Sequence, residues 1–80
     1  MYGELFSVFQ FFPDETYEKY VEHVGAEEAV KVAKRLTETV GARIGTTRRV
    51  IITDGGDHTV FEWKHGEGVT FPTTEQRARA

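Results

Sequence analysis

The chain is 80 residues long, contains no cysteine and carries a formal net charge of −3 at pH 7. A chain of this length has room for one hydrophobic core, and without cysteine it has neither a disulfide framework nor a thiolate zinc site. The negative charge argues against non-specific coating of DNA, because a nucleic-acid site would need a local basic patch. The first twelve residues lack the positive start of a signal peptide and are too short to span a membrane. We therefore expect a cytoplasmic location and no membrane partner.

Two segments before Gly25 are predicted to form strands. Residues 5–12 are rich in aromatic and β-branched side chains and stop at a proline, which is typical of a central strand that is apolar on both faces. Residues 17–24 are ambiguous, because their apolar side chains have helical spacing but residues 13–16 have the composition of a hairpin turn. We favour a strand for 17–24, and the alternative is a short helix kinked at Gly25.

The clearest helix signals follow Gly25. Glu27 and Glu28 occupy the first turn, where the helix dipole favours anions, and Gly41 stands where a glycine commonly ends a helix. Apolar residues recur between them at helical spacing: Ala29, Val30, Ala33, Leu36 and Val40. These signals predict one main helix.

Residues 48–53 and 58–64 are two β-rich runs around a Gly-Gly turn, which predicts a hairpin. In the second run Phe61 and Trp63 share one face, which we expect to be the core side, whereas Val60 alternates to the other. The chain from Val69 has no periodicity, so we expect an extended or frayed segment and, over 73–80, a disordered C-terminal tail.

Together these predictions give a single α+β domain over residues 1–72. Its elements run ββαββ, and its antiparallel sheet has the strand order 2-1-3-4 with one main helix on one face. This order makes every pairing antiparallel, places the most apolar strands in the centre and leaves charged strands at the edges. Agreement between pattern and topology supports the fold class.

No catalytic constellation is visible in the sequence, so we predict that the protein is not an enzyme and needs no cofactor. Ser7 is the only serine and has no base near it in sequence, and the three histidines lie in separate segments. The string Asp54–His58 joins two carboxylates and an imidazole, so a metal-dependent enzyme or metal site there is one alternative. Asp and Gly are also what a hairpin loop requires, and we favour that interpretation.

Arg43, Arg48 and Arg49 form the only basic cluster, and it leads into a strand with aromatic neighbours. Basic residues beside aromatic rings on a sheet are typical of single-strand nucleic-acid binding, which is a second alternative. In an alternating strand, however, Arg48 and Arg49 point to opposite faces and would not serve one surface.

The leading hypothesis is a small non-enzymatic binding or regulatory module that acts through a protein partner or as a homodimer. One helix covers only one side of a sheet, yet residues 5–12 are apolar on both sides, and Ile51 and Val60 alternate away from the predicted core. An exposed apolar sheet face is a known mark of interaction sites. The candidate binding residues are therefore Arg43, Arg48, Arg49, Ile51 and Val60.

Overall fold

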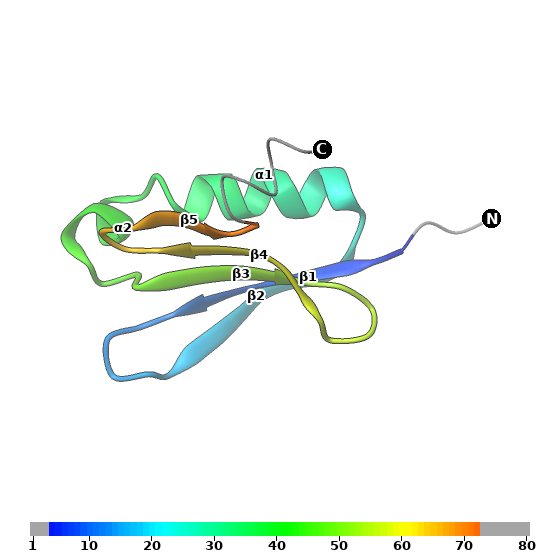
Figure 1. Ribbon diagram of the computed structural model, residues 1–80, viewed down its shortest axis with the longest axis horizontal. Coiled ribbons are helices and arrows are strands. Elements are labelled where there is room, and N and C mark those ends of the chain that lie inside the picture. The colour runs from blue at the N-terminus through cyan, green and yellow to red at the C-terminus, as the bar shows by residue number, and fades with distance from the viewer. Residues whose placement is uncertain (1–3, 73–80) are drawn as a thin grey trace.

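The computed structural model describes residues 4–72, and Figure 1 shows a sheet with helices on one side. The elements in chain order are β1 (Phe6–Phe11), β2 (Tyr17–Val24), α1 (Ala26–Leu36), α2 (Val40–Ile44), β3 (Arg49–Thr53), β4 (Thr59–Lys64) and β5 (Gly68–Phe71). All strand pairs are antiparallel, in the order β2-β1-β3-β4-β5. Neither helix in this region is long and apolar enough to cross a membrane.

The α+β class with an antiparallel sheet is confirmed, and so is the order 2-1-3-4 for the first four strands. The ββαββ pattern with one main helix is wrong, because the described chain contains a second helix and a fifth strand. Strand β5 pairs with β4 through Trp63 and Val69. The prediction that the fourth strand lies at an edge of the sheet is therefore wrong. The chain from Val69 was expected to be extended or frayed, and as far as Phe71 it is extended, in β5. The tail predicted over 73–80 lies outside the described residues.

The ambiguous segment 17–24 is strand β2, as favoured from the sequence. The loop that precedes β2 explains why the turn signals prevailed over the helical spacing. Asp14 Oδ1 accepts hydrogen bonds from the backbone N–H of Thr16 at 3.1 Å and from its hydroxyl at 2.6 Å, while Phe12 N–H donates to Thr16 O at 2.9 Å. These bonds close the hairpin between β1 and β2.

The predicted single helix is interrupted at residues 37–39, so Gly41 does not end it and instead lies inside α2. Thr39 is responsible, because its Oγ1 accepts a hydrogen bond from Ala42 N–H at 3.0 Å and so caps the start of a new helix. Two of the apolar residues at helical spacing lie outside the core. Val30 is 58% exposed within α1, and Val40, in the separate helix α2, is 70% exposed.

Helix α1 packs over β1, β3 and β2, and this layer forms the hydrophobic core. The buried members are Val8, Ala29, Val32, Ala33, Leu36, Val50 and Ile52. Phe61 and Trp63 pack against them as partly buried residues, which confirms that this is the core side of β4. Because α1 lies to one side, the helix face of β4 and β5 is only partly covered, and the opposite face of the whole sheet carries no helix (Figure 1).

Candidate functional site

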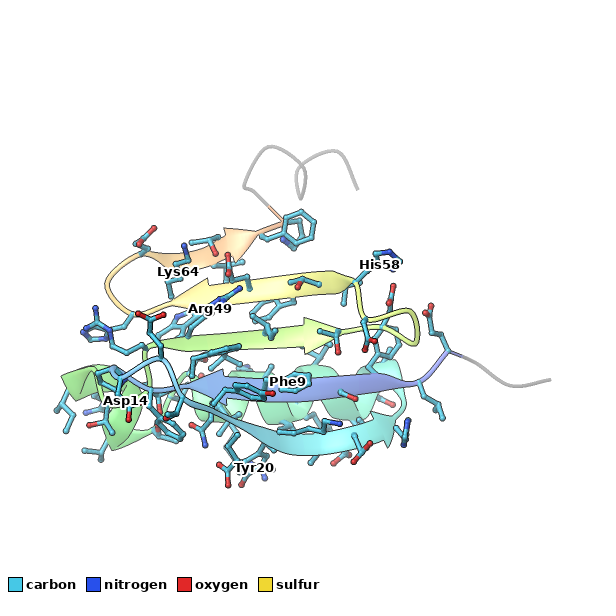
Figure 2. All side chains as sticks on the ribbon, turned by 90° about the horizontal axis from the view of Figure 1, so that it is seen from below. Phe9, Asp14, Tyr20, Arg49, His58 and Lys64 are labelled. Atoms are coloured by element: carbon cyan, nitrogen blue, oxygen red, sulfur yellow. The ribbon has the colours of Figure 1, made fainter. Side chains whose placement is uncertain are left out.

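The face of the sheet opposite α1, which we call the open face, is organised in two rows of side chains that cross the strands. The first row joins Tyr17, Phe11, Arg49 and Lys64, which are successive partners from β2 to β4. The second row joins Lys19, Phe9, Ile51, Glu62 and Phe71, from β2 to β5. Figure 2 views this face with α1 behind the sheet and shows Phe9 near its centre. Aromatic and charged side chains from strands distant in sequence therefore share one surface.

Phe9, Phe11 and Tyr17 form a ring cluster on the half of the open face made by β1 and β2. The ring centroid of Tyr17 lies 5.8 Å from that of Phe9 and 5.4 Å from that of Phe11, with tilted planes. Tyr17 is 61% exposed, whereas the two phenylalanines are half-buried. Such distances are typical of favourable aromatic contacts. The cluster is thus a preformed apolar platform with one ring presented to solvent.

Two cations lie against this ring cluster. Lys19 Nζ is 5.7 Å from the Phe9 centroid, and the guanidinium carbon of Arg49 is 4.7 Å from the Phe11 centroid. Both distances lie within the range of cation–π attraction. The platform therefore combines aromatic rings with positive charge, although the chain as a whole is acidic.

Arg49 is also the centre of a polar chain that reaches the edge strand. Its Nε donates to Glu62 Oε2 at 2.6 Å, and the Thr70 hydroxyl donates to Glu62 Oε1 at 2.6 Å. Burial by itself raises the pKa of Glu62, but the hydrogen bonds from Thr70 and Arg49 and the charges of Arg49 and Lys64 outweigh it and lower that pKa below its ordinary value. Glu62 is therefore ionised and holds Arg49 in place at neutral pH.

A hollow of about 350 Å³ opens at the end of the sheet where β1 ends, β3 begins and β4 ends. We call it the sheet-end hollow. Its charged lining residues are Arg48, Arg49, Lys64, Glu15 and Glu67, His65 lies beside them, and Phe11 belongs both to its wall and to the ring cluster. Its volume falls in the range of small-molecule sites, about 300–1,000 Å³. The hollow thus extends the platform into a concave, mainly cationic end.

Backbone hydrogen bonds fix the positions of the residues around this hollow. Arg48 N–H donates to Phe11 O at 2.8 Å, and His65 N–H donates to Arg48 O at 2.8 Å, so three strand ends are held in register. His65 Nδ1 donates to Ala42 O at 2.8 Å, because a carbonyl oxygen only accepts. Gly45 ends α2 with φ of +92°, and a Cβ there would lie 3.2 Å from His65 Nε2. Glycine leaves the room that this arrangement needs.

The structure brings together two of the three arginines predicted from the sequence. Arg49 is the first residue of β3 and Arg48 precedes the strand, and both line the sheet-end hollow because it opens at the end of the strand rather than on one face. The expectation that they would not serve one surface is therefore wrong. Arg43 is exposed on α2 and is absent from the lining of the hollow.

The two apolar candidates are placed on opposite sides of the sheet. Ile51 lies on the open face as predicted, but it is only 7% exposed because neighbouring side chains of the second row cover it. Val60 lines a hollow of about 270 Å³ on the helix side, together with Phe6, Ala29 and Phe61. A register shift in the β3–β4 pairing beside Val60 breaks the alternation that predicted its face.

The loop at Asp54–His58 is used for the hairpin turn. Asp54 Oδ1 accepts hydrogen bonds from the backbone N–H groups of Gly56 and His58, both at 2.9 Å. These bonds lower the pKa of Asp54 below its ordinary value, and the bond from His58 has the larger effect. Within residues 4–72 there is no group of three His, Asp or Glu side chains with the geometry to hold a metal ion.

A third hollow, strongly apolar and of about 220 Å³, lies beside α1, over the part of β4 and β5 that the helix leaves uncovered. Val30, Phe61, Trp63 and Val69 line it. It shares no lining residue with the sheet-end hollow, and it lacks the convergence of charges found there.

Sequence reasoning missed the ring cluster as a site. It assigned residues 5–12 a two-sided apolar character and did not name Phe9, Phe11 or Tyr17 as aromatic neighbours of the arginines. The alternation of Phe9 and Phe11 against Val8, combined with the predicted strand order, is the signal that places them on the open face beside β3. No family model, curated protein or solved structure matches this chain.

Proposed function

We propose that this chain is a small non-enzymatic binding module and that its open face binds single-stranded nucleic acid. The observation that carries the proposal is the meeting of the ring cluster with Lys19 and Arg49 on one surface. Unpaired bases stack on aromatic rings and on guanidinium planes, while cations hold the phosphates. The parts needed for sequence-tolerant recognition of a single strand are therefore adjacent.

The arrangement favours single strands over duplexes. Tyr17 offers the most exposed ring, and Arg49 over Phe11 offers a second surface for a base. In a duplex the bases are already stacked on each other and cannot reach these groups. We expect a single strand to bind along the first row, with bases on the rings and the backbone over Arg49 and Lys64.

The acidic charge of the chain sets the expected strength of binding. With a net charge of −3, the protein gains little from long-range attraction, and the binding energy comes from stacking and a few local phosphate contacts. We expect a dissociation constant in the micromolar range that rises steeply with salt, as for other weak sites of about 10⁻⁴–10⁻⁶ M.

Fluorescence anisotropy with labelled RNA and DNA strands of about ten nucleotides tests the proposal. Binding should be detectable for the single strands, absent for the duplex of the same sequence, and weaker at about 200 mM than at about 50 mM salt. Tyr17→Leu and Phe9→Leu keep apolar bulk but remove the ring, and each should weaken binding by about 1–3 kcal/mol.

Tyr20→Leu is the matched control, because Tyr20 lies on the same strand but at the outer edge of the sheet (Figure 2). It should leave binding unchanged. The absence of binding to any single strand, or equal losses from Tyr17→Leu and Tyr20→Leu, would refute the proposal.

A homodimer or other protein complex is the second candidate function, and the apolar hollow lined by Val30, Phe61, Trp63 and Val69 favours it. Burying this surface in a second copy would add apolar contact to a small core. Light-scattering mass measured over about a hundredfold range of concentration distinguishes the two ideas. A dimer that dissociates in Val30→Asp supports this candidate, and a monomer at every concentration removes it.

A cytoplasmic location accompanies either function and rests on the absence of cysteine.

A further inference from the structure

We propose that the sheet-end hollow binds a phosphate monoester, supplied by the terminal phosphate of a strand whose bases lie on the ring cluster. This inference rests on the proposed function and adds to it a fixed end for the bound strand. The hollow and the ring cluster share Phe11, so a base on the cluster and a phosphate in the hollow would belong to the same end of the strand.

Three permanent cations converge on the hollow from two neighbouring strands. Arg49 and Lys64 are partners across the β3–β4 pair, and Arg48 precedes Arg49 at the strand end. Of these three cations only Arg49 forms an ion pair within the described part of the chain, through its Nε with Glu62. Arg48 and Lys64 have no carboxylate oxygen within 4.0 Å in the same region. The hollow therefore offers donors that are not already neutralised.

The acidic residues of the hollow explain why a chain end fits better than a continuing strand. Glu15 lies in the loop after β1, and Glu67 lies in the turn after β4, and both line the same hollow. A backbone that passed through would bring further phosphates against these carboxylates, and like charges at short range repel. A phosphate at the end of a strand meets the cations without extending beyond them.

Charge favours a monoester over the diester of an internal linkage. A terminal phosphate carries about −1.5 to −2 charges at pH 7, whereas an internal diester carries about −1. Charge-assisted hydrogen bonds from arginine to phosphate are often bidentate and are stronger than neutral ones. Three cations in one concavity match the higher charge.

The geometry also holds one of the cations in place before any ligand arrives. Backbone bonds to Phe11 and His65 fix the main chain of Arg48 at the rim of the hollow. Arg49 is held between the Phe11 ring and Glu62. Side chains ordered in advance lose less entropy when a ligand binds.

The test uses the full chain, with nuclear magnetic resonance shifts to locate binding and anisotropy to measure it. The probes are inorganic phosphate, adenosine monophosphate against adenosine, and one oligonucleotide prepared with a 5′ phosphate, a 3′ phosphate or hydroxyl ends. We expect a phosphate at one of the two ends, 5′ or 3′, to tighten binding of the oligonucleotide by about tenfold over the same strand with hydroxyl ends. Amide shifts should centre on Arg48 and Lys64.

Matched variants separate a built site from general attraction. Arg48→Gln and Lys64→Gln should each reduce, by about three- to tenfold, the gain in affinity that the terminal phosphate gives. Glu67→Gln should increase that gain. Arg43→Gln makes the same charge change outside the hollow and should leave the gain intact. Equal effects of Arg43→Gln and Arg48→Gln would overturn the inference.

The outcomes distinguish this inference from the function on which it rests. Oligonucleotide binding that ignores the state of the ends overturns the phosphate site and leaves the proposed function standing. Binding of phosphate and adenosine monophosphate at the hollow, without binding of any oligonucleotide, supports the site and overturns the proposed function. Adenosine that binds as well as its monophosphate also overturns the phosphate site.

Discussion

The guanidinium carbon of Arg49 lies 4.7 Å from the centroid of the Phe11 ring, so a cation of β3 lies against an aromatic ring of the neighbouring strand. The same side chain donates from Nε to Glu62 on the other neighbouring strand. Arg49 thus connects three strands across the open face. A lysine would supply the charge without the planar fork that permits both contacts.

The connecting role of Arg49 gives a prediction on stability. Arg49→Gln should lower the free energy of unfolding by about 1–2 kcal/mol, because it removes a cation–π contact and leaves a half-buried carboxylate with one fewer donor. Lys31→Gln is the control, since Lys31 is exposed on α1 and makes no ion pair or cation–π contact with the described residues, and it should change stability by less than about 0.5 kcal/mol. Urea denaturation measures both values, and equal losses would contradict this role for Arg49.

Acid should destabilise the protein through Glu62. Its folded pKa lies below the ordinary value of 4.5, so the unfolded chain takes up a proton at a higher pH than the folded protein does. The stability that it contributes is complete above that ordinary value and is lost as the pH falls through the lowered, folded pKa. Asp14 and Asp54 shift in the same direction through their turn hydrogen bonds.

Unfolding free energies at about pH 6 and about pH 3.5 check this expectation. The loss of stability on acidification should be smaller in Glu62→Gln than in the wild type, because the variant lacks the titrating group. Glu18→Gln, on the edge strand, should keep the wild-type loss. An unchanged loss in Glu62→Gln would contradict the assignment.

Any side chain at Gly45 is expected to lower the stability of the protein. Gly45→Ala puts a Cβ at φ of +92° and 3.2 Å from His65 Nε2, and it should cost about 1–2 kcal/mol of stability. Gly55→Ala is the control, because Gly55 has no positive φ and its nearest contact would be an ordinary 3.7 Å from Glu4. Thermal melting compares the two, and a Gly45→Ala variant as stable as Gly55→Ala would contradict the described end of α2.

One substitution made at two valines tests the location of the core. Val50 is fully buried between α1 and the sheet, and Val50→Ala should lower the free energy of unfolding by about 2 kcal/mol through lost burial and a cavity. Val40, exposed on α2, should change by less than about 0.5 kcal/mol on the same replacement. Similar losses at both positions would show that the core is placed incorrectly.

The fold class could be predicted from the sequence because the separate sequence signals agree with one another. The apolar run 5–12, the hairpin residues around Asp14 and Asp54, and the acidic first turn of α1 all indicate the observed elements. The end of α1 could not be predicted, because the helical spacing continues to Val40, whereas side-chain hydrogen bonds of Thr37 and Thr39 to the backbone mark the interruption. A local hydrogen bond there prevails over periodicity.

Only part of the candidate site could be predicted from the sequence. The sequence identified Arg48 and Arg49, but their common hollow depends on where β1, β3 and β4 end relative to one another. Val60 was misplaced because the register shift beside it breaks the alternation, and no residue type marks a bulge of this kind. The ring cluster depends on the pairing of β1 with β2 and β3, which is a tertiary property.

The pairing of β1 with β3 is the one strand pair of the described sheet without a register shift. It joins Ser7 to Thr53 and Phe11 to Arg49, so β2 and both helices lie inside the loop that it closes. The three hairpins β1–β2, β3–β4 and β4–β5 can form locally, but the centre of the sheet requires closure of this long loop before Val8 and Ile52 come into contact. We therefore expect the β1–β3 pairing to form the main kinetic barrier and folding to take on the order of milliseconds, as in other mixed domains.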